Sequence, residues 1–249
     1  ELAKLSEWGV AGVKVDFFQS DKPEIIKLMW DVLSDAADNQ IMVNLHGCAV
    51  PRGWQRTWPH LMSVEGVRGG EQYAFAPEFP ETAIWHNTIL PYTRNVIGPM
   101  DYTPVTISDQ LYPHLTSTAH EIALGLLYES GVQHYADSIE AYRSLPDRAI
   151  GLLKRAPAAW DETRHVDGFP GSHSVIARRN GAAWYVAGIA GPEVVEVEFD
   201  PWWLEEERSG MLVRDGDSGA LDITDVTVAP GTLTRMTIPE RGGFVLELR

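Results

Sequence analysis

Carboxylates in the sequence stand at points where buried strands are expected to end. Asp16 interrupts the apolar, β-branched run GVKVDFF, and Glu65 closes the run LMSVE. A carboxylate inside a buried strand costs free energy unless it is paired, binds a metal or lies at the open end of the strand. Asp16 is therefore either a structural group, which caps a helix or pairs with Lys14, or a catalytic carboxylate at the C-terminal end of a strand.

A further carboxylate, Glu71, follows Glu65 after a glycine-rich turn in the segment VEGVRGGE. Two carboxylates that converge with Asp16 would suit cleavage of a glycosidic bond, one as acid/base and one as nucleophile. They would equally suit Ca²⁺, which prefers oxygen ligands. The spacing also fits a surface loop whose carboxylates pair with nearby arginines, so the residues alone leave these interpretations open.

The elements that would position these carboxylates follow from alternating strand-like and helical segments. Short apolar runs begin at Gly12, Ile41 and Leu61, and a helical stripe of apolar residues over 21–40 separates the first two. Such alternation is typical of parallel βαβ units. Each strand-like run ends in a polar side chain, as expected at the C-terminal face of a (β/α) barrel. These side chains are Asp16, His46, Glu65, Asp101 and Asp137.

The pattern changes after residue 156, where helical periodicity ends. The segment that follows contains short strand-like runs, and Asn180–Gly181 gives a strong hairpin signal. We therefore predict an α/β fold with a (β/α) barrel segment over residues 1–156, which the family resemblance described below makes the second half of a (β/α)₈ barrel. An antiparallel β-sandwich domain is predicted over residues 157–249.

Composition narrows the classes of function. The 249 residues carry a net charge of −15, which argues against nucleic-acid and anionic-membrane partners, because both require clustered basic residues. Cys48 is the only cysteine, which excludes an intrachain disulfide, and no apolar run approaches the length of a membrane helix. The sequence opens at Glu1 on what resembles the interior of a helix, so we expect a piece of a longer protein.

Three long stretches of the sequence resemble glycoside hydrolase family 97. They are GVKVDFFQSD, VNLHG with the later PRGWQRTWPHLMSVEGVRGGE, and HNTILPYTRNVIGPMDYTP. The family comprises calcium-dependent α-glucosidases and α-galactosidases with an N-terminal β-sandwich, a (β/α)₈ barrel and a C-terminal β domain. The resemblance implies that this chain holds the second half of the barrel and the C-terminal domain. It also implies that a missing N-terminal portion completes the barrel, and that the enzyme is periplasmic or secreted in bacteria.

Two positions relate the chain to one branch of that family. Inverting members carry a catalytic Glu where this chain has Gly47, and retaining members carry an Asp nucleophile at the position of Asp16. The resemblance therefore implies a retaining, exo-acting enzyme that cleaves terminal α-galactosides by double displacement. Its substrate would be an α-linked oligosaccharide or an aryl α-galactoside.

The resemblance also implies roles for the remaining carboxylates. It makes Glu71 the acid/base and places Glu65 on Ca²⁺, with Glu71 as a second metal ligand, although which of the two is the acid/base stays open. An acid/base must hold a proton at the first step, so we expect a raised pKa, to which the Asp16 carboxylate would contribute. Lys14 lies two residues before Asp16 on the same strand face, where it would bind a sugar hydroxyl or hold Asp16 ionised.

Four further residues are expected to bind substrate, each with a structural alternative. His46 would donate to a sugar hydroxyl or serve as a core histidine. Arg68 would orient a carboxylate or form a surface ion pair. Trp85 would stack on a sugar ring or pack in the core, and Asp101 would bind sugar or cap a turn.

Two other functions stay open from the sequence. An α-glucosidase of the same family would differ in the residues that contact the sugar 4-hydroxyl. A non-catalytic carbohydrate-binding protein would lack part of the reacting site. Turnover of an aryl α-galactoside would exclude the second.

Overall fold

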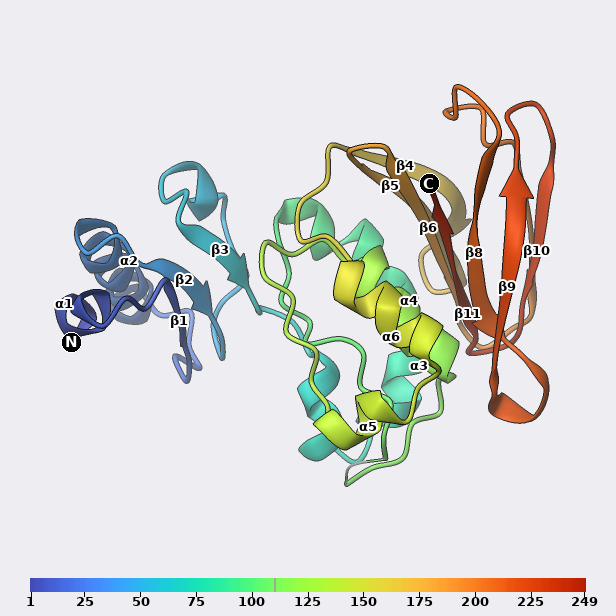
Figure 1. Cartoon of the computed structure of the whole chain (residues 1–249). Helices are drawn as coiled ribbons and strands as arrows, with labels where there is room; N and C mark the ends of the chain where they lie inside the picture. Colours follow the sequence, from blue (N-terminus) through green and yellow to red (C-terminus); the bar gives the residue numbers. More distant parts are fainter. Residues whose placement is uncertain (110) are drawn as a thin grey trace.

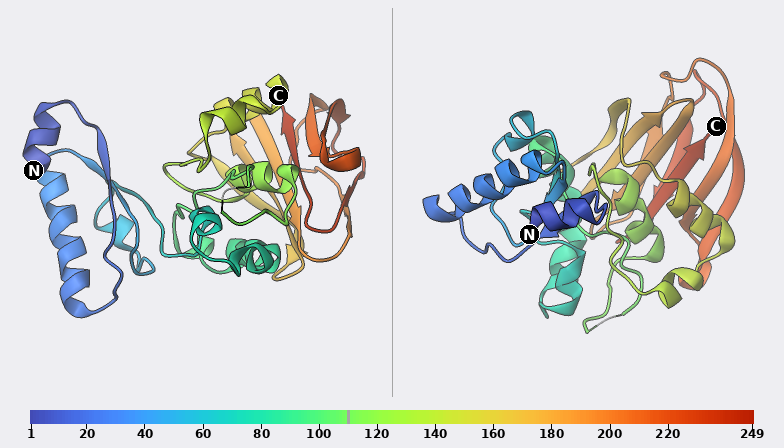
Figure 2. Two further views of the ribbon diagram at one scale, coloured as in Figure 1. Left: turned by 90° about the horizontal axis from the view of Figure 1, so that it is seen from below. Right: turned by 60° about the vertical axis from the view of Figure 1, so that its left-hand side comes forward.

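The computed structural model describes residues 1–109 and 111–249. Its N-terminal segment contains a parallel sheet of β1 (Gly12–Val15), β2 (Met42–Leu45) and β3 (Leu61–Val64), in that order. Helix α1 (Leu2–Glu7) precedes the sheet, and α2 (Pro23–Asp38) connects β1 to β2. The strand–helix–strand order predicted for this segment is confirmed. The segment, drawn in blue, extends away from the rest of the molecule in Figure 1 and in the left view of Figure 2.

The two faces of this sheet differ in chemistry. On one face, Met29 and Leu33 of α2 are buried with Val43 and Leu45 of β2, because four-residue spacing along α2 brings its apolar side chains to one stripe. The polar side chains of the strands are in register with one another, with Lys14 opposite Asn44 and Asn44 opposite Ser63. They therefore share the other face of the sheet.

Two of the predicted strands are not formed in the part of the chain that the structure describes. The run around Met100 is reduced to an isolated parallel bridge between Val64 and Met100, and residues 132–138 form no strand. Pro99 and Pro104 flank the bridge, and proline has no backbone N–H to donate to a ladder.

Helices form the middle of the molecule (Figure 1). They are α3 (Phe79–Ile89), α4 (Thr118–Leu127), α5 (Ile139–Arg143) and α6 (Asp147–Arg155). Short 3₁₀ turns lie at η1 (Trp54–Arg56), η2 (Gly70–Ala74), η3 (Leu90–Tyr92), η4 (Asn95–Ile97) and η5 (Asp217–Gly219). Every residue of α4 from Ala119 to Leu127 is buried, and the Ser117 hydroxyl caps its start by accepting a hydrogen bond of 3.0 Å from the His120 N–H.

Antiparallel sheets form the C-terminal part. The strands are β4 (Glu162–Phe169), β5 (His173–Asn180), β6 (Ala183–Ala190), β7 (Val195–Phe199), β8 (Arg208–Asp215), β9 (Leu221–Val228), β10 (Thr234–Ile238) and β11 (Gly243–Leu248). Six of them pair in the order β4-β5-β6-β11-β8-β9, and β7 pairs with β10. The predicted antiparallel C-terminal domain is confirmed, including the hairpin in which Asn180 pairs with Ala183.

The six-stranded sheet is buried on both faces. Successive residues of β6 point to opposite faces of the sheet, and each face packs in a different hydrophobic core. Tyr185 packs in the core that contains the helices, and Val186 packs in the core that contains β7 and β10. Helix α6 ends at Arg155 and β4 begins at Glu162, so the change from helices to strands falls in this interval. The division at residues 156 and 157 into two domains stays a prediction. None of the described helices is long and apolar enough to cross a membrane.

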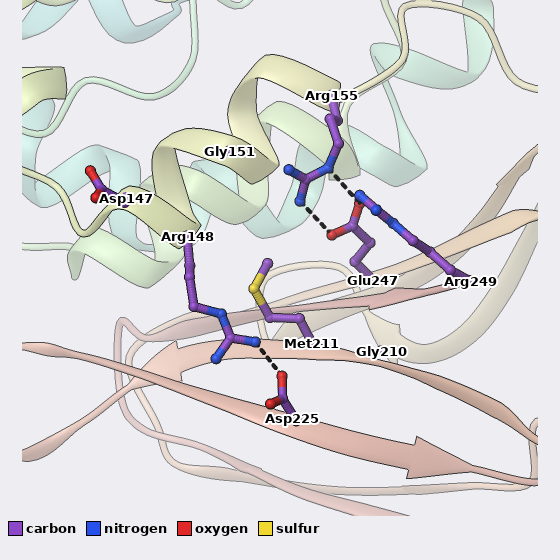
Figure 3. A pocket seen from close by; sticks show the side chains of 9 residues that line it. All are labelled: Asp147, Arg148, Gly151, Arg155, Gly210, Met211, Asp225, Glu247 and Arg249. Atoms are coloured by element: carbon purple, nitrogen blue, oxygen red, sulfur yellow. Dashed lines mark hydrogen bonds and ion pairs between the residues drawn. The ribbon is translucent and has the colours of Figure 1, made fainter.

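One buried carboxylate connects the last helix to the sheet. Glu247 of β11 is almost fully buried and accepts two hydrogen bonds from Arg155, at 3.2 Å and 2.8 Å. Arg249 donates to the same carboxylate at 2.8 Å. Figure 3 shows Arg155 reaching from α6 to Glu247, while Arg148 reaches Asp225 on β9. These ion pairs fix α6 against the outer half of the sheet.

Candidate active site

The ends of the parallel strands lie side by side. Val15 pairs with Leu45, Leu45 pairs with Val64, and Val64 bridges to Met100. The residues that directly follow these partners are Asp16, His46, Glu65 and Asp101. The parallel register therefore brings to one edge of the sheet the polar side chains that the sequence placed on separate segments.

Gly47 lies between the Asp16 and Glu65 carboxylates. Its N–H donates to Glu65 Oε2 at 2.7 Å. A Cβ atom at this position would lie 2.7 Å from Asp16 Oδ1 and 2.9 Å from the Phe17 nitrogen, and the φ of Gly47 is +51°. Only glycine satisfies both the left-handed backbone and the space left by Asp16. A side chain at position 47 is thus incompatible with Asp16 in this position.

Glu65 is a half-buried member of a cluster of like charges. Its Oε1 lies 3.6 Å from His46 Nδ1, and ligand atoms of His46, Glu65 and Glu71 lie within 4.8 Å of one another. Burial raises the pKa of Glu65, and the Glu71 and Asp16 carboxylates raise it further, against the lowering effects of His46 and the Gly47 N–H. The raised pKa expected of an acid/base is thus found at Glu65.

Glu71 is positioned by close contact between two backbone segments. The Gly70 N–H donates to the Tyr102 carbonyl at 2.7 Å, and the Glu71 N–H donates to the Thr103 hydroxyl at 3.2 Å. A side chain at Gly69 would overlap the Tyr102 carbonyl oxygen. Lys14 Nζ lies 3.0 Å from Glu71 Oε1, so the ammonium group predicted to serve Asp16 contacts Glu71.

Asp101 is the centre of a buried hydrogen-bond network. It accepts from His46 Nε2 at 2.7 Å, from His134 Nδ1 at 2.6 Å and from Asn44 Nδ2. Burial by itself would raise the pKa of Asp101, but the hydrogen bonds from His134, His46 and Asn44 outweigh it and hold the pKa well below its usual range. The hydrogen bond to Asp101 in turn raises the pKa of His134. Asp101 is therefore an anion that fixes the orientation of both imidazole rings.

This network differs from what the sequence predicted for the substrate-binding residues. Asp101 and His46 were expected to touch sugar, yet both are fully enclosed by protein in the described part of the chain. Asn44 and His134 were not predicted. Asn44 is a polar residue inside the apolar run IMVNL, and it lies opposite Lys14 in the parallel register. A polar residue within an apolar run is a feature from which Asn44 could have been predicted. His134 had no such signal, because it lies outside any regular strand.

Arg68 and Trp85 lie apart from the carboxylate cluster. Arg68 Nη2 pairs with Glu78 Oε1 at 2.7 Å, and both side chains are largely exposed. Trp85 lies on α3 with 48% of its surface exposed and its ring edge-on to His86. Within residues 1–109 and 111–249, no described contact joins either side chain to Asp16, Glu65 or Glu71.

Comparison with known proteins gives two matches to family models. Residues 1–67 match the model described as glycoside hydrolase 97. Residues 159–249 match the model described as glycosyl-hydrolase 97 C-terminal, oligomerisation.

Curated relatives agree with these matches. The chain is 39% identical over 248 residues to a probable retaining alpha-galactosidase of Streptomyces bingchenggensis, covering 98% of this chain and 37% of the relative. It is 30% identical over 222 residues to a retaining alpha-galactosidase of Bacteroides thetaiotaomicron, covering 85% of this chain and 33% of the relative. The chain thus spans about a third of the length of each relative.

Solved structures share the fold over nearly the whole chain. A crystal structure of a beta-arabinopyranosidase superposes with a TM-score of 0.91 at 31% identity, covering 99% of this chain and 40% of that one. A family 97 enzyme from Pseudoalteromonas sp. strain K8, in complex with acarbose, superposes with a TM-score of 0.90 at 22% identity, covering all of this chain and 43% of that one. From the matched models and the relatives together, the chain belongs to glycoside hydrolase family 97.

Proposed function

We propose that this chain forms part of a retaining, exo-acting glycoside hydrolase that removes terminal α-galactosyl units. The observation that carries the proposal is Asp16 at the end of β1, beside a glycine that leaves room for its carboxylate. The names of the curated relatives, both retaining alpha-galactosidases, support the same reaction. Because the chain spans only 37% of the first relative, the proposal concerns the whole protein that carries this chain.

We infer that β1, β2, β3 and the bridged Met100 segment are consecutive strands of a (β/α)₈ barrel. The inference is supported by their parallel order, their polar ends and the apolar packing of α2 on one face. β1 has one partner, β2, among the described strands. The barrel would therefore close with strands supplied from outside this chain, and an N-terminal portion of the protein would complete the site.

The reaction would proceed by two displacements at the anomeric carbon. Asp16 would attack that carbon while Glu71 protonates the departing glycosidic oxygen, leaving a covalent glycosyl-enzyme. Glu71, now ionised, would remove a proton from water, which displaces Asp16 and restores both carboxyl groups. Lys14 contacts Glu71, and we propose that it turns to a sugar hydroxyl when substrate binds.

The residues present fit the Ca²⁺ that family membership implies. Glu65 and Glu71 provide carboxylate oxygens, the ligand type that Ca²⁺ prefers, within 4.8 Å of each other. Ca²⁺ takes about 6–8 oxygen ligands, so the others would come from outside this chain or from water. Glu65 and Glu71 would hold the cation, which would supply positive charge to the site, while Asp101 holds His46 in place.

A second substrate class is favoured by the 31% identity to a beta-arabinopyranosidase. β-L-Arabinopyranose matches α-D-galactopyranose in its ring hydroxyls and lacks the exocyclic CH₂OH group. An α-glucoside differs instead at the 4-hydroxyl. The values of kcat/KM for an aryl α-galactoside, an aryl β-arabinopyranoside and an aryl α-glucoside would rank these possibilities. We expect the galactoside to be hydrolysed fastest.

The stereochemistry of the first product tests the mechanism. Proton NMR of the whole protein acting on an aryl α-galactoside, recorded before mutarotation, should show α-galactose first, because two inversions give retention. Release of β-galactose first would contradict both the nucleophilic role of Asp16 and the retaining assignment.

A further inference from the structure

A buried tyrosine anchors the short turn η2, which carries Glu71. In the described part of the chain η2 has no side-chain cap, so tertiary contacts must fix it. Tyr73 lies two residues after Glu71 in this turn and is completely buried in the core that contains the helices. A 3₁₀ turn has about three residues, so positions 71 and 73 point to different sides. The way in which Tyr73 enters the core therefore affects the direction in which Glu71 points away from it.

The Tyr73 ring contacts two other aromatic rings. Its centroid lies 3.7 Å from that of His114, at an interplanar angle of 33°, and Phe79 meets it edge-on with centroids 4.9 Å apart. These contacts restrict the tilt of the ring. A hydrogen bond at the hydroxyl is more directional than ring packing, so it can also fix how far the ring reaches into the core.

The Tyr73 hydroxyl meets a buried carboxyl group of α4. It lies 3.4 Å from the Thr116 hydroxyl oxygen and 3.5 Å from Glu121 Oε1, and the Thr116 hydroxyl donates to the same Oε1 at 2.6 Å. Glu121 is only 1% exposed and lies in the first turn of α4. We call Tyr73, Thr116 and Glu121 the Glu121 cluster. The cluster connects η2 to α4.

Glu121 can act in this cluster as an uncharged acceptor. Burial raises the pKa of Glu121 to about 8, although hydrogen bonds from Thr116, Tyr73 and the Thr106 N–H lower it. At neutral pH the carboxyl group is therefore mostly protonated. Its Oε1 still accepts from the hydroxyls, and no uncompensated charge enters the core.

The beginning of η2 is held by a separate contact. The Gly70 N–H donates to the Tyr102 carbonyl at 2.7 Å, and a Cβ atom at Gly70 would lie 2.7 Å from Thr106 Oγ1. Glu71 thus stands between a backbone contact one residue before it and the buried Tyr73 side chain two residues after it. The first contact sets where the turn lies, and the second limits how the turn can rotate. Rotation of so short a turn would move the Glu71 carboxyl group directly.

We propose that Tyr73 and Glu121 are positioning residues for the acid/base Glu71. The inference rests on the proposed function, in which Glu71 protonates the departing glycosidic oxygen. Neither Tyr73 nor Glu121 touches substrate, because both are enclosed by the helical core. They act by fixing the rotation of η2, and proton transfer requires the carboxyl group within hydrogen-bond reach of the leaving oxygen.

The dependence of rate on the leaving group tests this role in the whole protein. The probes are aryl α-galactosides whose phenol leaving groups differ in pKa, and kcat/KM reports the first displacement, in which Glu71 donates its proton. Tyr73→Phe removes only the hydroxyl. It should lower kcat/KM about tenfold more for the poorest leaving group than for the best one. The slope of log kcat/KM against leaving-group pKa does not depend on the fraction of protein that is folded, so a merely structural role would leave it unchanged.

Tyr128→Phe is the matched control for the hydroxyl. Tyr128 is buried in the same core and donates to the Asn87 carbonyl at 2.9 Å, but it belongs neither to η2 nor to the Glu121 cluster. Its slope should equal that of wild type. A slope as steep in Tyr128→Phe as in Tyr73→Phe would overturn the proposal, because any loosening of the core would then have the same effect.

Variants of Glu121 test the acceptor independently of Tyr73. Glu121→Leu removes the acceptor oxygen at similar size and should steepen the slope, whereas Glu121→Gln keeps an acceptor oxygen and should retain the wild-type slope. Equal slopes in these two variants would overturn the role of Glu121. A steeper slope in Glu71→Gln, with wild-type slopes in Tyr73→Phe and Glu121→Leu, would overturn this inference alone. An unchanged slope in Glu71→Gln would overturn the acid/base assignment and this inference together.

Discussion

At the scale of single residues, Gly47 controls the space around the Asp16 carboxylate. Its N–H serves Glu65, and its missing side chain leaves room for Asp16. A side chain at position 47 is therefore incompatible with Asp16 for a steric reason. The same cause would make the Glu and the Asp that the family resemblance implies for the inverting and retaining branches alternatives to each other.

Gly47→Ala tests that cause. The added methyl group would press on Asp16 Oδ1 at a φ of +51°, so kcat should fall about tenfold or more while the free energy of unfolding falls by about 1 kcal/mol. Kinetics on an aryl α-galactoside and thermal unfolding measure the two effects. The matched control is Gly53→Ala, which has a φ of +77° and open space around it. Equal losses of kcat in the two variants would mean that backbone strain alone explains the effect.

Asp16→Asn tests the nucleophile. The amide cannot attack the anomeric carbon, so turnover should fall by about 10³-fold or more, with the fold retained. Azide should restore part of the rate and give a β-configured glycosyl azide, because a small anion can use the vacated space. Asp21→Asn, an exposed carboxylate five residues later, serves as control. Activity near wild type without azide would rule out the assignment.

The roles of Glu65 and Glu71 can be separated by the leaving group. If Glu71 is the acid/base, Glu71→Gln should slow substrates with poor leaving groups far more than activated aryl glycosides, because only the former need protonation. Glu65→Gln should instead weaken the binding of Ca²⁺. A chelator should therefore inhibit this variant at a lower concentration than it inhibits wild type. The opposite pattern would make Glu65, whose pKa burial raises, the acid/base.

At the scale of elements, the site depends on strand ends and on one tight loop contact. The parallel register lines up Asp16, His46 and Glu65, whereas Glu71 reaches the cluster only because η2 packs against the Tyr102–Thr103 segment. Thr103 has a φ of +54°, an unfavourable conformation for a β-branched residue. Such strain is maintained only when surrounding structure enforces it, here by the hydrogen bond from the Glu71 N–H.

Gly69→Ala tests this loop contact. The methyl group would overlap the Tyr102 carbonyl oxygen and push η2 away, so kcat should fall about a hundredfold, since small misplacements of a catalytic group are costly. Gly210→Ala creates a comparable overlap with the Glu247 carbonyl in the C-terminal sheet. It should lower the melting temperature, whereas kcat of the folded fraction should stay near wild type. Equal kcat in both variants would show that the contact does not position Glu71.

At the scale of the whole molecule, the helices share one core with the C-terminal sheet, and Glu247 ties α6 to its outer half. Burial by itself would raise the pKa of Glu247, but hydrogen bonds from Arg155 and Arg249 hold it below its usual value. A lowered folded-state pKa stabilises the protein above the unfolded pKa of about 4.3, and this contribution is lost as the pH falls through the folded pKa.

Glu247→Gln should therefore destabilise the protein in a pH-dependent way. At pH 7 we expect the free energy of unfolding to fall by about 1–3 kcal/mol, the value of hydrogen bonds to a charged group. The difference from wild type should begin to shrink as the pH falls below the unfolded pKa of about 4.3, and should be lost as the pH falls through the lower folded-state pKa, where the wild-type carboxylate becomes protonated. Denaturant unfolding at pH 7 and at low pH measures this difference in the free energy of unfolding. Glu240→Gln, which changes an exposed carboxylate, is the control. A difference independent of pH would assign the effect to packing.

The sequence by itself determined the strand–helix–strand order of the N-terminal segment, the antiparallel C-terminal part and the family, because hydrophobic periodicity, turn residues and long motifs are local features of the chain. It also identified the carboxylates, since a charge at the end of an apolar run stands out without any structure. It missed the buried partners Asn44 and His134, and it did not predict the contact between Lys14 and Glu71.

Only the tertiary structure decided which of these groups meet. Lys14 and Glu71 are 57 residues apart, and their contact depends on where η2 packs, which no local pattern encodes. The same applies to Arg68, whose guanidinium pairs with Glu78. Burial likewise depends on all neighbours at once, so the enclosure of His46 and Asp101 and the raised pKa of Glu65 emerge only when strands distant in sequence pack together.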